Sequence, residues 1–402
     1  MYHHTELVQI NKFLFNSGEY LSGGKENMNS RERVFKTLNH EEPDRVPIDI
    51  GGTSCTTMVE PVYQKLLGKY HIKNKDYGII HSPTRSINIH EEVKELLHSD
   101  TDIMCVNEPS GGRIKMTEYG FIDEWGVKYR RSKVGDDFYY DICRNPLAEA
   151  ELGDLGKYPW PDPLDPARYK GLKEKAKMLA EKDRFILGSI LESSIFEVAW
   201  YLRGFQEFLI DIISNKKFAH ALLEKITFIQ KTIYEKFLEE VGEHIDMIFI
   251  ADDLATQDSL LFSPALYREM IKPYQMEYFK VKEKNGLKLL YHCCGDVYPL
   301  LDDLTEMGVD AINPVQISAR EMDPARLKEK YGDQICFWGG VDTQNVLNAT
   351  NRDFIISSIK KVMDIFAPGG GFVLTSVHNI QSDVPVENIK TMIDCALSFG
   401  KY

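Results

Sequence analysis

The sequence lacks a long hydrophobic segment. No apolar run in its 402 residues approaches the roughly 18 to 20 residues that a membrane-spanning helix needs. The polar start, MYHHTELVQINKF, also lacks the hydrophobic centre of a secretory signal peptide. We therefore expect a cytoplasmic protein with no membrane partner.

Positive charge is also scarce. The chain has 48 Lys and Arg against 61 Asp and Glu, a net charge of −13 at pH 7, and no stripe of basic residues interleaved with aromatics. This charge balance disfavours binding to phosphate-rich nucleic acid, so we expect no nucleic-acid partner. An acidic surface leaves protein partners open.

Cysteine is sparse and follows no pattern. Seven cysteines are scattered over the chain, an odd number that argues against a disulfide framework and for reduced thiols, some of them bound to a metal. The rest of the composition is that of an ordinary globular protein, with 43% hydrophobic and 27% charged residues. Such a chain is long enough to bury a large core.

Short apolar runs rich in β-forming residues recur along the chain. There are eight of them, at residues 46–52, 101–107, 185–191, 247–253, 288–294, 311–315, 336–341 and 372–377. Helical patterns separate the later runs, and continuous apolar strands alternating with helices are typical of a parallel sheet that is covered on both faces. Because eight is the strand number of the closed parallel barrel, we predict an α/β fold of the (β/α)8 (TIM) barrel class.

Two regions fall outside the barrel pattern. Residues 1–28 are predicted to be an N-terminal extension, and residues 29–402 a single barrel domain with an insertion at about 110–145. Within that insertion, residues 113–142 alternate polar and aromatic side chains around turn-like glycines, which predicts antiparallel hairpins. Its aromatic residues leave two roles open, a homodimer contact or closure of one end of the barrel.

Polar residues cluster where the predicted strands end. In a parallel barrel the carboxyl ends of all strands meet at the active-site mouth. The residues delivered there are Asp49, Asp252, Asp253, His292, Cys294, Asn313, Gln316, Trp338, Asp342 and His378. The glycine pairs Gly51-Gly52 and Gly339-Gly340 mark places where the backbone turns sharply or comes close to a ligand.

A metal site is the first hypothesis for this mouth. His292 and Cys294 lie two residues apart on one predicted strand and therefore point the same way, whereas Cys293 points away and is expected to pack against helices. Zinc prefers nitrogen and sulfur ligands, and a catalytic zinc keeps one position free. With His378 the site would have three protein ligands. The alternative is that His292 and Cys294 are buried strand residues without a metal, and that His378 forms a hydrogen bond with the backbone.

Further candidates lie beside these ligands. Asp252 and Asp253 could act as general base, orient a ligand histidine or cap the following turn, and only one of them can face inward. Glu192 follows the third predicted strand and precedes an amphipathic segment in which Phe196 and Trp200 are expected to be core residues or to wall a substrate.

Five stretches together resemble the uroporphyrinogen decarboxylase superfamily. They are SRERVFKTLNHEEPDRVPIDIGG, IADDLATQDSLLFSP, YHCCGDVYPLLDDLTEMGVDAINPVQ, CFWGGVDTQ and VHNIQSDVPVENI. The resemblance covers nearly the whole chain from about Asn29. It implies a (β/α)8 barrel with one of two activities, metal-free decarboxylation of a porphyrinogen or zinc-dependent methyl transfer that involves corrinoid proteins, thiols or methyl ethers.

The resemblance favours the methyltransferase branch. The family's decarboxylases carry an arginine-rich segment near the N-terminus, whereas the corresponding IDIGGTSCTTMVEP has no arginine. The methyltransferase branch has His-x-Cys after strand five and a cysteine after strand eight, where this chain has His378. Where thiol-methylating members have an acidic residue near the end of strand six, this chain has Gln316. The implied zinc ligands are His292, Cys294 and His378.

We therefore predict a zinc-dependent methyltransferase that moves a methyl group between a small methylated substrate, for example an aromatic methyl ether, and a corrinoid protein. Zinc on two imidazoles and one thiolate keeps more positive charge than on two thiolates, which favours an oxygen substrate. The chain has no recognisable corrinoid-binding motif, so the corrinoid is expected on a partner. The alternatives are a metal-independent decarboxylase of a small carboxylate and a non-catalytic binding protein on the same barrel.

Roles follow for the remaining mouth residues. The predicted catalytic residues are Asp252, Asp253 and Gln316. The predicted substrate-binding residues are Glu192, Asn313, Trp338 and Asp342.

Overall fold

The computed structural model describes residues 28–73, 77–134, 137–191 and 193–402. The predicted extension, 1–28, lies outside these residues except for Met28. No helix in the described ranges has both the length and the apolar character needed to cross a bilayer.

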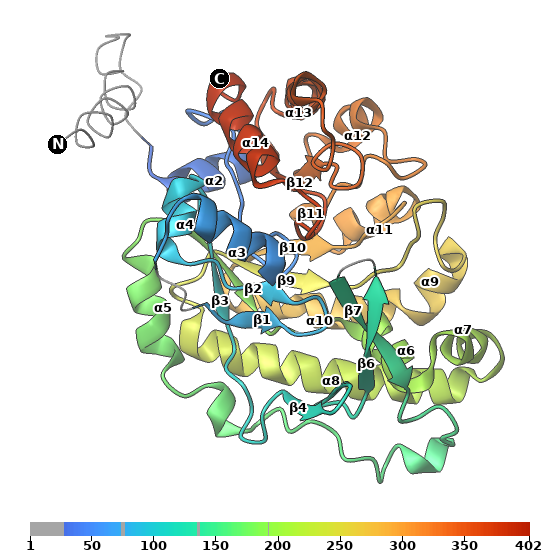
Figure 1. Cartoon of the computed structure of the whole chain (residues 1–402). Helices are drawn as coiled ribbons and strands as arrows, with labels where there is room; N and C mark the ends of the chain where they lie inside the picture. Colours follow the sequence, from blue (N-terminus) through green and yellow to red (C-terminus); the bar gives the residue numbers. More distant parts are fainter. Residues whose placement is uncertain (1–27, 74–76, 135–136, 192) are drawn as a thin grey trace.

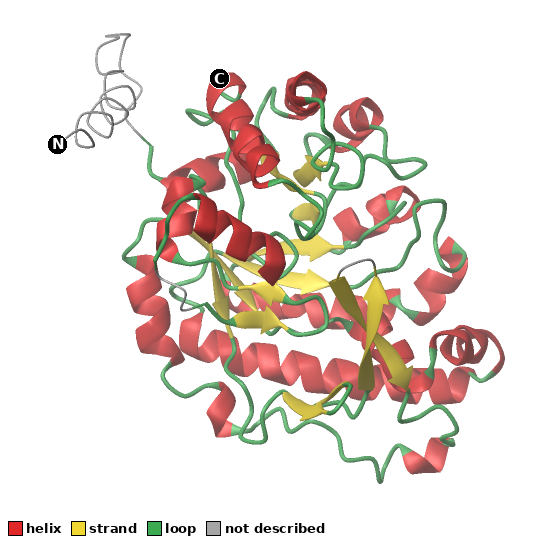
Figure 2. Ribbon diagram, viewed as in Figure 1, coloured by secondary structure: helices red, strands yellow, loops and turns green. Residues whose placement is uncertain are grey.

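A curled parallel sheet forms the centre of the molecule (Figures 1 and 2). Its strands stand in the order β13-β12-β11-β10-β9-β8-β3, and every paired neighbour is parallel. The strands are β3 (Thr101–Cys105), β8 (Phe185–Ser189), β9 (Met247–Ala251), β10 (Lys288–His292), β11 (Ala311–Asn313), β12 (Cys336–Val341) and β13 (Phe372–Ser376). Seven of the eight predicted apolar runs are thus confirmed as strands, in chain order around the sheet.

The first predicted run, 46–52, is not a regular strand, so the prediction of eight strands is not confirmed. This segment nevertheless lies between the two edge strands. Leu374 of β13 accepts a hydrogen bond from the N–H of Asp49 (3.0 Å), and Ile48 accepts one from Asp100, next to β3 (2.7 Å). Pro47 has no N–H for the ladder, and the chain turns at Gly51 with φ at 86°, which together limit regular pairing.

Helices surround the sheet, as the alternating pattern predicts (Figure 2). They are α2 (Ser30–Leu38), α3 (Glu60–Lys69), α4 (Glu91–Leu96), α5 (Leu172–Ala180), α6 (Ile195–Arg203), α7 (Phe205–Ser214), α8 (Lys216–Val241), α9 (Pro264–Met270), α10 (Lys272–Phe279), α11 (Leu301–Glu306), α12 (Pro324–Tyr331), α13 (Arg352–Phe366) and α14 (Val386–Phe399). A capping box starts α2, because the Asn29 side chain accepts from the N–H of Glu32 and the Glu32 side chain accepts from the N–H of Asn29.

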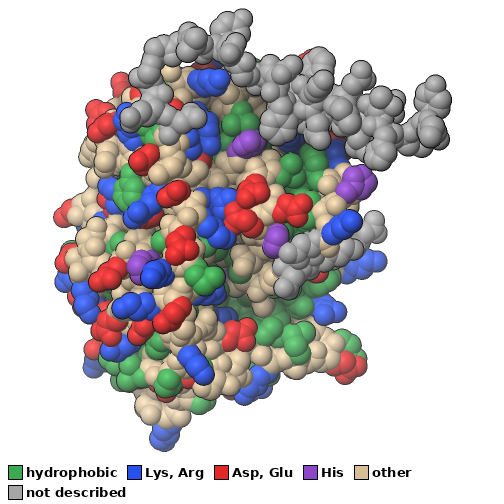
Figure 3. Space-filling view, turned by 90° about the vertical axis from the view of Figure 1, so that its left-hand side faces the viewer, with side chains coloured by type: hydrophobic (Ala, Val, Ile, Leu, Met, Phe, Trp, Pro, Cys, Tyr) green, Lys and Arg blue, Asp and Glu red, His purple; other side chains and the backbone are tan. Residues whose placement is uncertain are grey.

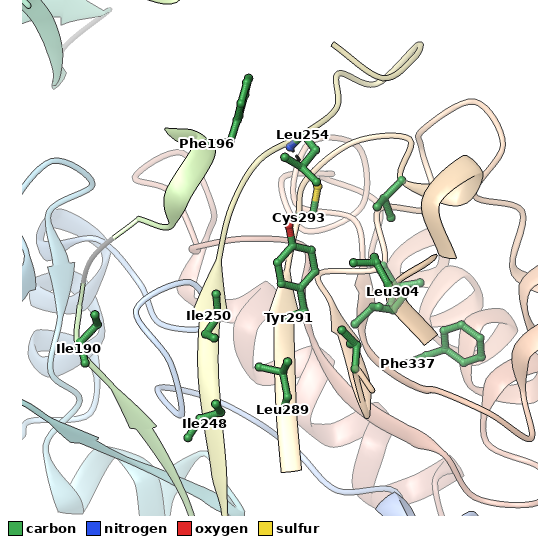
Figure 4. Packing of buried hydrophobic residues seen from close by; sticks show 14 of the residues in the cluster. Ile190, Phe196, Ile248, Ile250, Leu254, Leu289, Tyr291, Cys293, Leu304 and Phe337 are labelled. Atoms are coloured by element: carbon green, nitrogen blue, oxygen red, sulfur yellow. Dashed lines mark hydrogen bonds between the residues drawn. The ribbon is translucent and has the colours of Figure 1, made fainter. Parts of the chain in front are cut away.

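Strand residues alternate between two cores. Leu289, Tyr291 and Cys293 point toward the surrounding helices (Figure 4), whereas Leu290 belongs to the interior cluster. That interior cluster also holds Phe185, Leu187, Met247, Phe249, Trp338 and Val373, with Val34 and Leu38 of α2 packed against them. The interior below the mouth is therefore filled with side chains, and the chemistry is left to the rim.

The insertion forms a sheet of its own. β4 (Ile114–Thr117), β5 (Gly120–Asp123), β6 (Lys128–Val134) and β7 (Asp137–Arg144) pair antiparallel in this order, as predicted for 113–142. A two-stranded ribbon, β1 (Ile79–His81) and β2 (Ser86–Ile87), lies nearby in the chain. Arg85 ties the two together, because it donates to Asp137 (2.6 Å) and stacks on Phe138.

Charged side chains of both signs are interspersed on the face shown in Figure 3. Exposed side chains also form ion pairs, such as Lys182 with Glu91 and Lys236 with Glu239. Pairs of this kind on a wet surface contribute little to stability, typically about 0 to 1 kcal/mol.

Candidate metal centre

His292 ends β10 and is held in one orientation. The imidazole is buried, and its Nδ1 lies 2.5 Å from Oδ1 of Asn313, whose Nδ2 donates in turn to the carbonyl of Trp338 (2.9 Å). The amide orientation makes Nδ1 the donor and leaves Nε2 as a lone pair at the mouth. Burial lowers the pKa of His292 to about 4, so the ring is neutral at neutral pH and ready to bind a metal.

Cys294 and Asp253 face this lone pair. The Sγ of Cys294 lies 3.5 Å from Nε2 of His292, and Oδ1 of Asp253 lies 3.9 Å from the same nitrogen. Asp253 also accepts a hydrogen bond from the N–H of Cys294 (2.7 Å). The three residues offer ligand atoms that all lie within 4.8 Å of one another. The predicted strand pair therefore converges, with an aspartate as third member.

His378 belongs to a second set that shares His292. Its ring centre lies 5.6 Å from that of His292, and Cys55 completes a trio whose ligand atoms lie within 4.8 Å of one another. Burial lowers the pKa of His378 to about 4. Among the described residues no set within this distance joins His292, Cys294 and His378 all together. His292 is the residue common to both sets.

Cys55 was not among the site residues predicted from the sequence. It lies in the loop after the irregular segment 46–52, at the same edge as the strand ends. The available signal was a cysteine within four residues of the Gly51-Gly52 turn, near a predicted strand end. Burial raises the pKa of the Cys55 and Cys294 thiols, so a bound cation would be needed to hold them as thiolates.

The neighbouring Asp252 faces away from the mouth and binds helix α6. Its carboxylate accepts from the backbone N–H of Phe196 (3.2 Å) and Glu197 (2.9 Å), and from Nε2 of Gln275 (2.9 Å). Burial raises the pKa of Asp252 to about 7. Of the two aspartates only Asp253 looks into the mouth, as alternation requires, and Asp252 has the contacts of a helix cap.

Gln316 and Asp342, two of the remaining candidates, lie at the rim. Gln316 accepts from the N–H of Gly295 through Oε1 (2.8 Å) and borders the mouth. Asp342 accepts from the N–H of Gln344 (2.7 Å) and Asn345 (3.1 Å), which makes it a cap of its own loop.

Trp338 lies below the rim. It is three residues from the end of β12 and fully buried. Its Nε1 donates to Asp49 (2.7 Å). Position 339 requires glycine because the backbone of Pro314 lies so close that a Cβ there would collide with it. Glu192 lies outside the described residues.

A cavity of about 590 Å³ opens on one side of His378. Its aromatic walls come from the insertion and from α6, and they consist of Phe121, Trp125, Tyr129, Tyr139, Tyr140, Trp200 and Tyr201. Of the two roles predicted for Trp200, core residue or wall of a substrate site, its position in the cavity lining favours the second. Phe196 packs instead against Phe208 and Phe262 in the core.

Most of the charged groups that line this aromatic cavity are paired or neutral. Glu124 pairs with Arg113 (3.6 Å) and with Arg168. Asp123 accepts from the N–H of Val127 (2.9 Å), and burial raises its pKa to about 7. Burial, followed by the Arg113 charge, lowers the pKa of His81 to about 4. The aromatic cavity therefore presents mainly neutral groups to a ligand.

A second cavity of about 360 Å³ lies on the other side of His378 and Cys294. Its lining is rich in amides and hydroxyls, namely Thr256, Gln257, Gln316, Ser318, Thr343, Gln344, Asn379 and Gln381. Gln381 borders both cavities and accepts a hydrogen bond from the hydroxyl of Tyr139 (2.9 Å). Of the metal-donor residues, His378 thus borders both the aromatic cavity and the amide cavity, and Cys294 borders the amide cavity.

The donors fit zinc. Neutral imidazoles and thiols, with one carboxylate, are the ligands of a borderline-soft ion, whereas magnesium and calcium prefer sites made of oxygen. The side-chain hydrogen bond that orients His292 is the support that zinc-bound histidines normally have.

The chain is similar to one family across most of its length. A family model described as uroporphyrinogen decarboxylase (URO-D) matches residues 143–399, more than half of the chain. Uroporphyrinogen decarboxylase from Coxiella burnetii is 24% identical over 185 residues, 45% of this chain and 47% of that protein. The same enzyme from Legionella pneumophila is 26% identical over 200 residues, 48% of this chain and 51% of that protein. The chain spans about half the length of these curated relatives.

A solved structure extends the likeness to the whole fold. A methyltransferase from Methanosarcina mazei superposes with a TM-score of 0.63 and covers 93% of this chain and 99% of that one. The sequences are 18% identical, so this likeness concerns the fold.

Proposed function

The chain belongs to the uroporphyrinogen decarboxylase family, and from the geometry of its mouth we propose that it is a zinc-dependent methyltransferase. We infer that it moves a methyl group between an aromatic methyl ether and a corrinoid carried by a partner protein. The observation that carries the proposal is a cluster of nitrogen and sulfur donors around His292, placed beside an aromatic cavity. A zinc ion in that cluster supplies Lewis acidity toward an ether oxygen.

The aromatic cavity supports a neutral aromatic substrate. Seven aromatic side chains line it, and such walls bury and orient a flat ring. A cationic methyl donor would gain most from an uncompensated carboxylate, whereas Glu124 is already paired with two arginines. The cavity volume of about 590 Å³ is that of a small-molecule site.

The same cavity argues against a porphyrinogen substrate. A porphyrinogen carries several carboxylates, which need basic partners. Among the described lining residues Arg113 is the only Lys or Arg, and it pairs with Glu124. The decarboxylase alternative therefore finds little support at the mouth, although the curated relatives carry that name.

The proposed transfer breaks the bond between the methyl carbon and the ether oxygen and forms a bond between that carbon and cobalt. Cobalt(I) of the acceptor gives an electron pair to the methyl carbon, the electron pair of the breaking C–O bond stays on the ether oxygen, and this oxygen takes up one proton. The chain offers a hydrogen-bonded route for that proton at the cavity wall. The hydroxyl of Tyr201 donates to Glu197 (2.7 Å) and lies 3.2 Å from the hydroxyl of Ser193. We assign delivery of the proton to this chain of groups.

A direct test uses protein purified without a metal-affinity tag. We expect about one zinc per chain, and formation of methylcobalamin and a phenol when neutral methoxybenzenes and chemically reduced cobalamin are added. The variant His292→Ala should lose both, while Asp342→Asn, which changes a loop cap at the same rim, should keep the zinc. A full zinc content in His292→Ala would refute the site. A zinc-loaded protein that releases CO2 from small carboxylates and transfers no methyl group would refute the reaction.

A further inference from the structure

The loop that carries Cys55 is held in place by several hydrogen bonds. Asp49 anchors it from below, because its buried carboxylate accepts from the N–H of Gly52 (2.8 Å), the hydroxyl of Thr101 (2.5 Å) and Nε1 of Trp338 (2.7 Å). A Cβ at Gly52 would lie 2.6 Å from both Asp49 and Thr101, so the turn needs glycine there.

The upper half of the loop is held just as closely. The N–H of Gly51 donates to the carbonyl of Thr56 (2.8 Å), and the side chain of Thr53 accepts from the N–H of Cys55 and of Thr56, each at 3.1 Å. The Cα of Cys55 is therefore fixed relative to the barrel. A fixed backbone lets a side chain meet a metal at small entropic cost.

The thiol of Cys55 reaches the two histidines of the mouth. It shares a trio with His292 and His378, whereas Cys294 meets His292 from the other set. Through the shared His292 the two sets together offer two imidazoles and two thiols, which are donors typical of a tetrahedral zinc site.

We propose that Cys55 is a zinc ligand, so that the resting metal is held by Cys55, His292, Cys294 and His378. This proposal rests on the proposed function, because it concerns the same ion. Asp253 then positions Cys294 through its backbone N–H instead of binding the metal. These four side chains would complete a tetrahedral set of protein ligands for the ion.

The proposal changes the expected charge at the metal. With two thiolates the ion would be less electrophilic than at the site of two imidazoles and one thiolate inferred from the sequence.

X-ray absorption of zinc in the unmodified protein tests the claim without any mutation. We expect about two sulfur neighbours per zinc at about 2.3 Å, together with two nitrogen neighbours. One sulfur per zinc would overturn the role of Cys55 and leave the metal site of the proposed function in place.

Cobalt(II) substitution assigns the two sulfurs. The thiolate-to-cobalt charge-transfer absorption should fall to about half in Cys55→Ser and in Cys294→Ser, and should disappear when both changes are combined. Cys55→Ser should also weaken zinc binding at least tenfold in competition with a chromophoric chelator. Cys105→Ser is the matched control, because Cys105 is likewise half-buried at a strand end but lies outside both donor sets.

The outcomes separate the two claims. Full absorption in Cys55→Ser together with loss in Cys294→Ser would overturn the role of Cys55 alone. No change in any of the cysteine variants would overturn both this inference and the metal site on which it rests.

Discussion

The two cavities beside His378 differ in origin as well as in chemistry. The amide cavity is built from loops that follow the barrel strands, whereas the aromatic cavity takes most of its aromatic side chains from β5, β6 and β7 of the insertion and from α6. This difference suggests that the barrel rim and the insertion have separate roles. In the proposed function, the barrel rim would supply the metal ligands and hydrogen-bonding groups, and the inserted sheet would select the methyl donor.

The largest effect is expected when His292, the residue common to both donor sets, is removed. His292→Ala should lose bound zinc and lower methyl transfer at least a hundredfold, because the ligand has no substitute in either set. Binding of a neutral methoxybenzene in the aromatic cavity should persist. Metal content, turnover and ligand titration are measured on the same preparation. Loss of aromatic binding together with zinc would contradict the separation of the two functions.

Shortening an aromatic wall should affect only the donor substrate. Trp200→Leu should raise KM for an aromatic ether by about ten- to a hundredfold, since a well-packed ring contact contributes about 1 to 3 kcal/mol. Its zinc content should stay at one per chain.

Gln344→Ala in the amide cavity is the matched comparison for Trp200→Leu. It should leave KM for the ether within about twofold, because its contact is with Gln257 and the aromatic walls are untouched. Equal effects of the two changes on KM for the ether would remove the distinction between the cavities.

A more moderate effect is expected where the cavities meet. His378→Cys should retain zinc but slow turnover of an oxygen substrate about tenfold, because an added thiolate lowers the positive charge on the metal. The rate is measured at saturating ether, with zinc content determined in parallel. Unchanged or faster turnover would argue against Lewis-acid activation of an ether.

The smallest effect concerns stability of the aromatic side. Burial raises the pKa of Asp123 from 3.8 to about 7, so the folded protein holds a proton that the unfolded chain releases in this range. Stability therefore falls as pH rises from about 4 to about 7, with a slope of up to about 1.4 kcal/mol per pH unit. Asp123→Asn should flatten this fall in urea unfolding curves and be more stable than the parent at pH 8. An identical slope would show that Asp123 is charged in the fold.

Much of the barrel could be predicted because each strand carries its own evidence. Apolar runs located seven strands, and alternation along β10 separated His292 from Cys293. Alternation also required that Asp252 and Asp253 face opposite sides. These inferences depend only on neighbouring residues, whose geometry a strand fixes.

What failed depends on contacts between distant parts of the chain. The irregularity of 46–52 follows from Pro47 and from a turn that is anchored through Trp338, 289 residues away from Asp49. Cys55 lies on that turn, so its approach to the histidines could not be read from local spacing. Trp338 was predicted to bind substrate because it lies near the end of the predicted run 336–341, whereas the structure buries it below the rim, where its Nε1 donates to Asp49.

Anomalous diffraction from zinc-soaked crystals, recorded on both sides of the zinc absorption edge, tests the central claim most directly. We predict one peak about 2.0 to 2.1 Å from Nε2 of His292, with the sulfur of Cys294 about 2.3 Å from the same peak. An ordered mouth with no anomalous peak between these two atoms would contradict it.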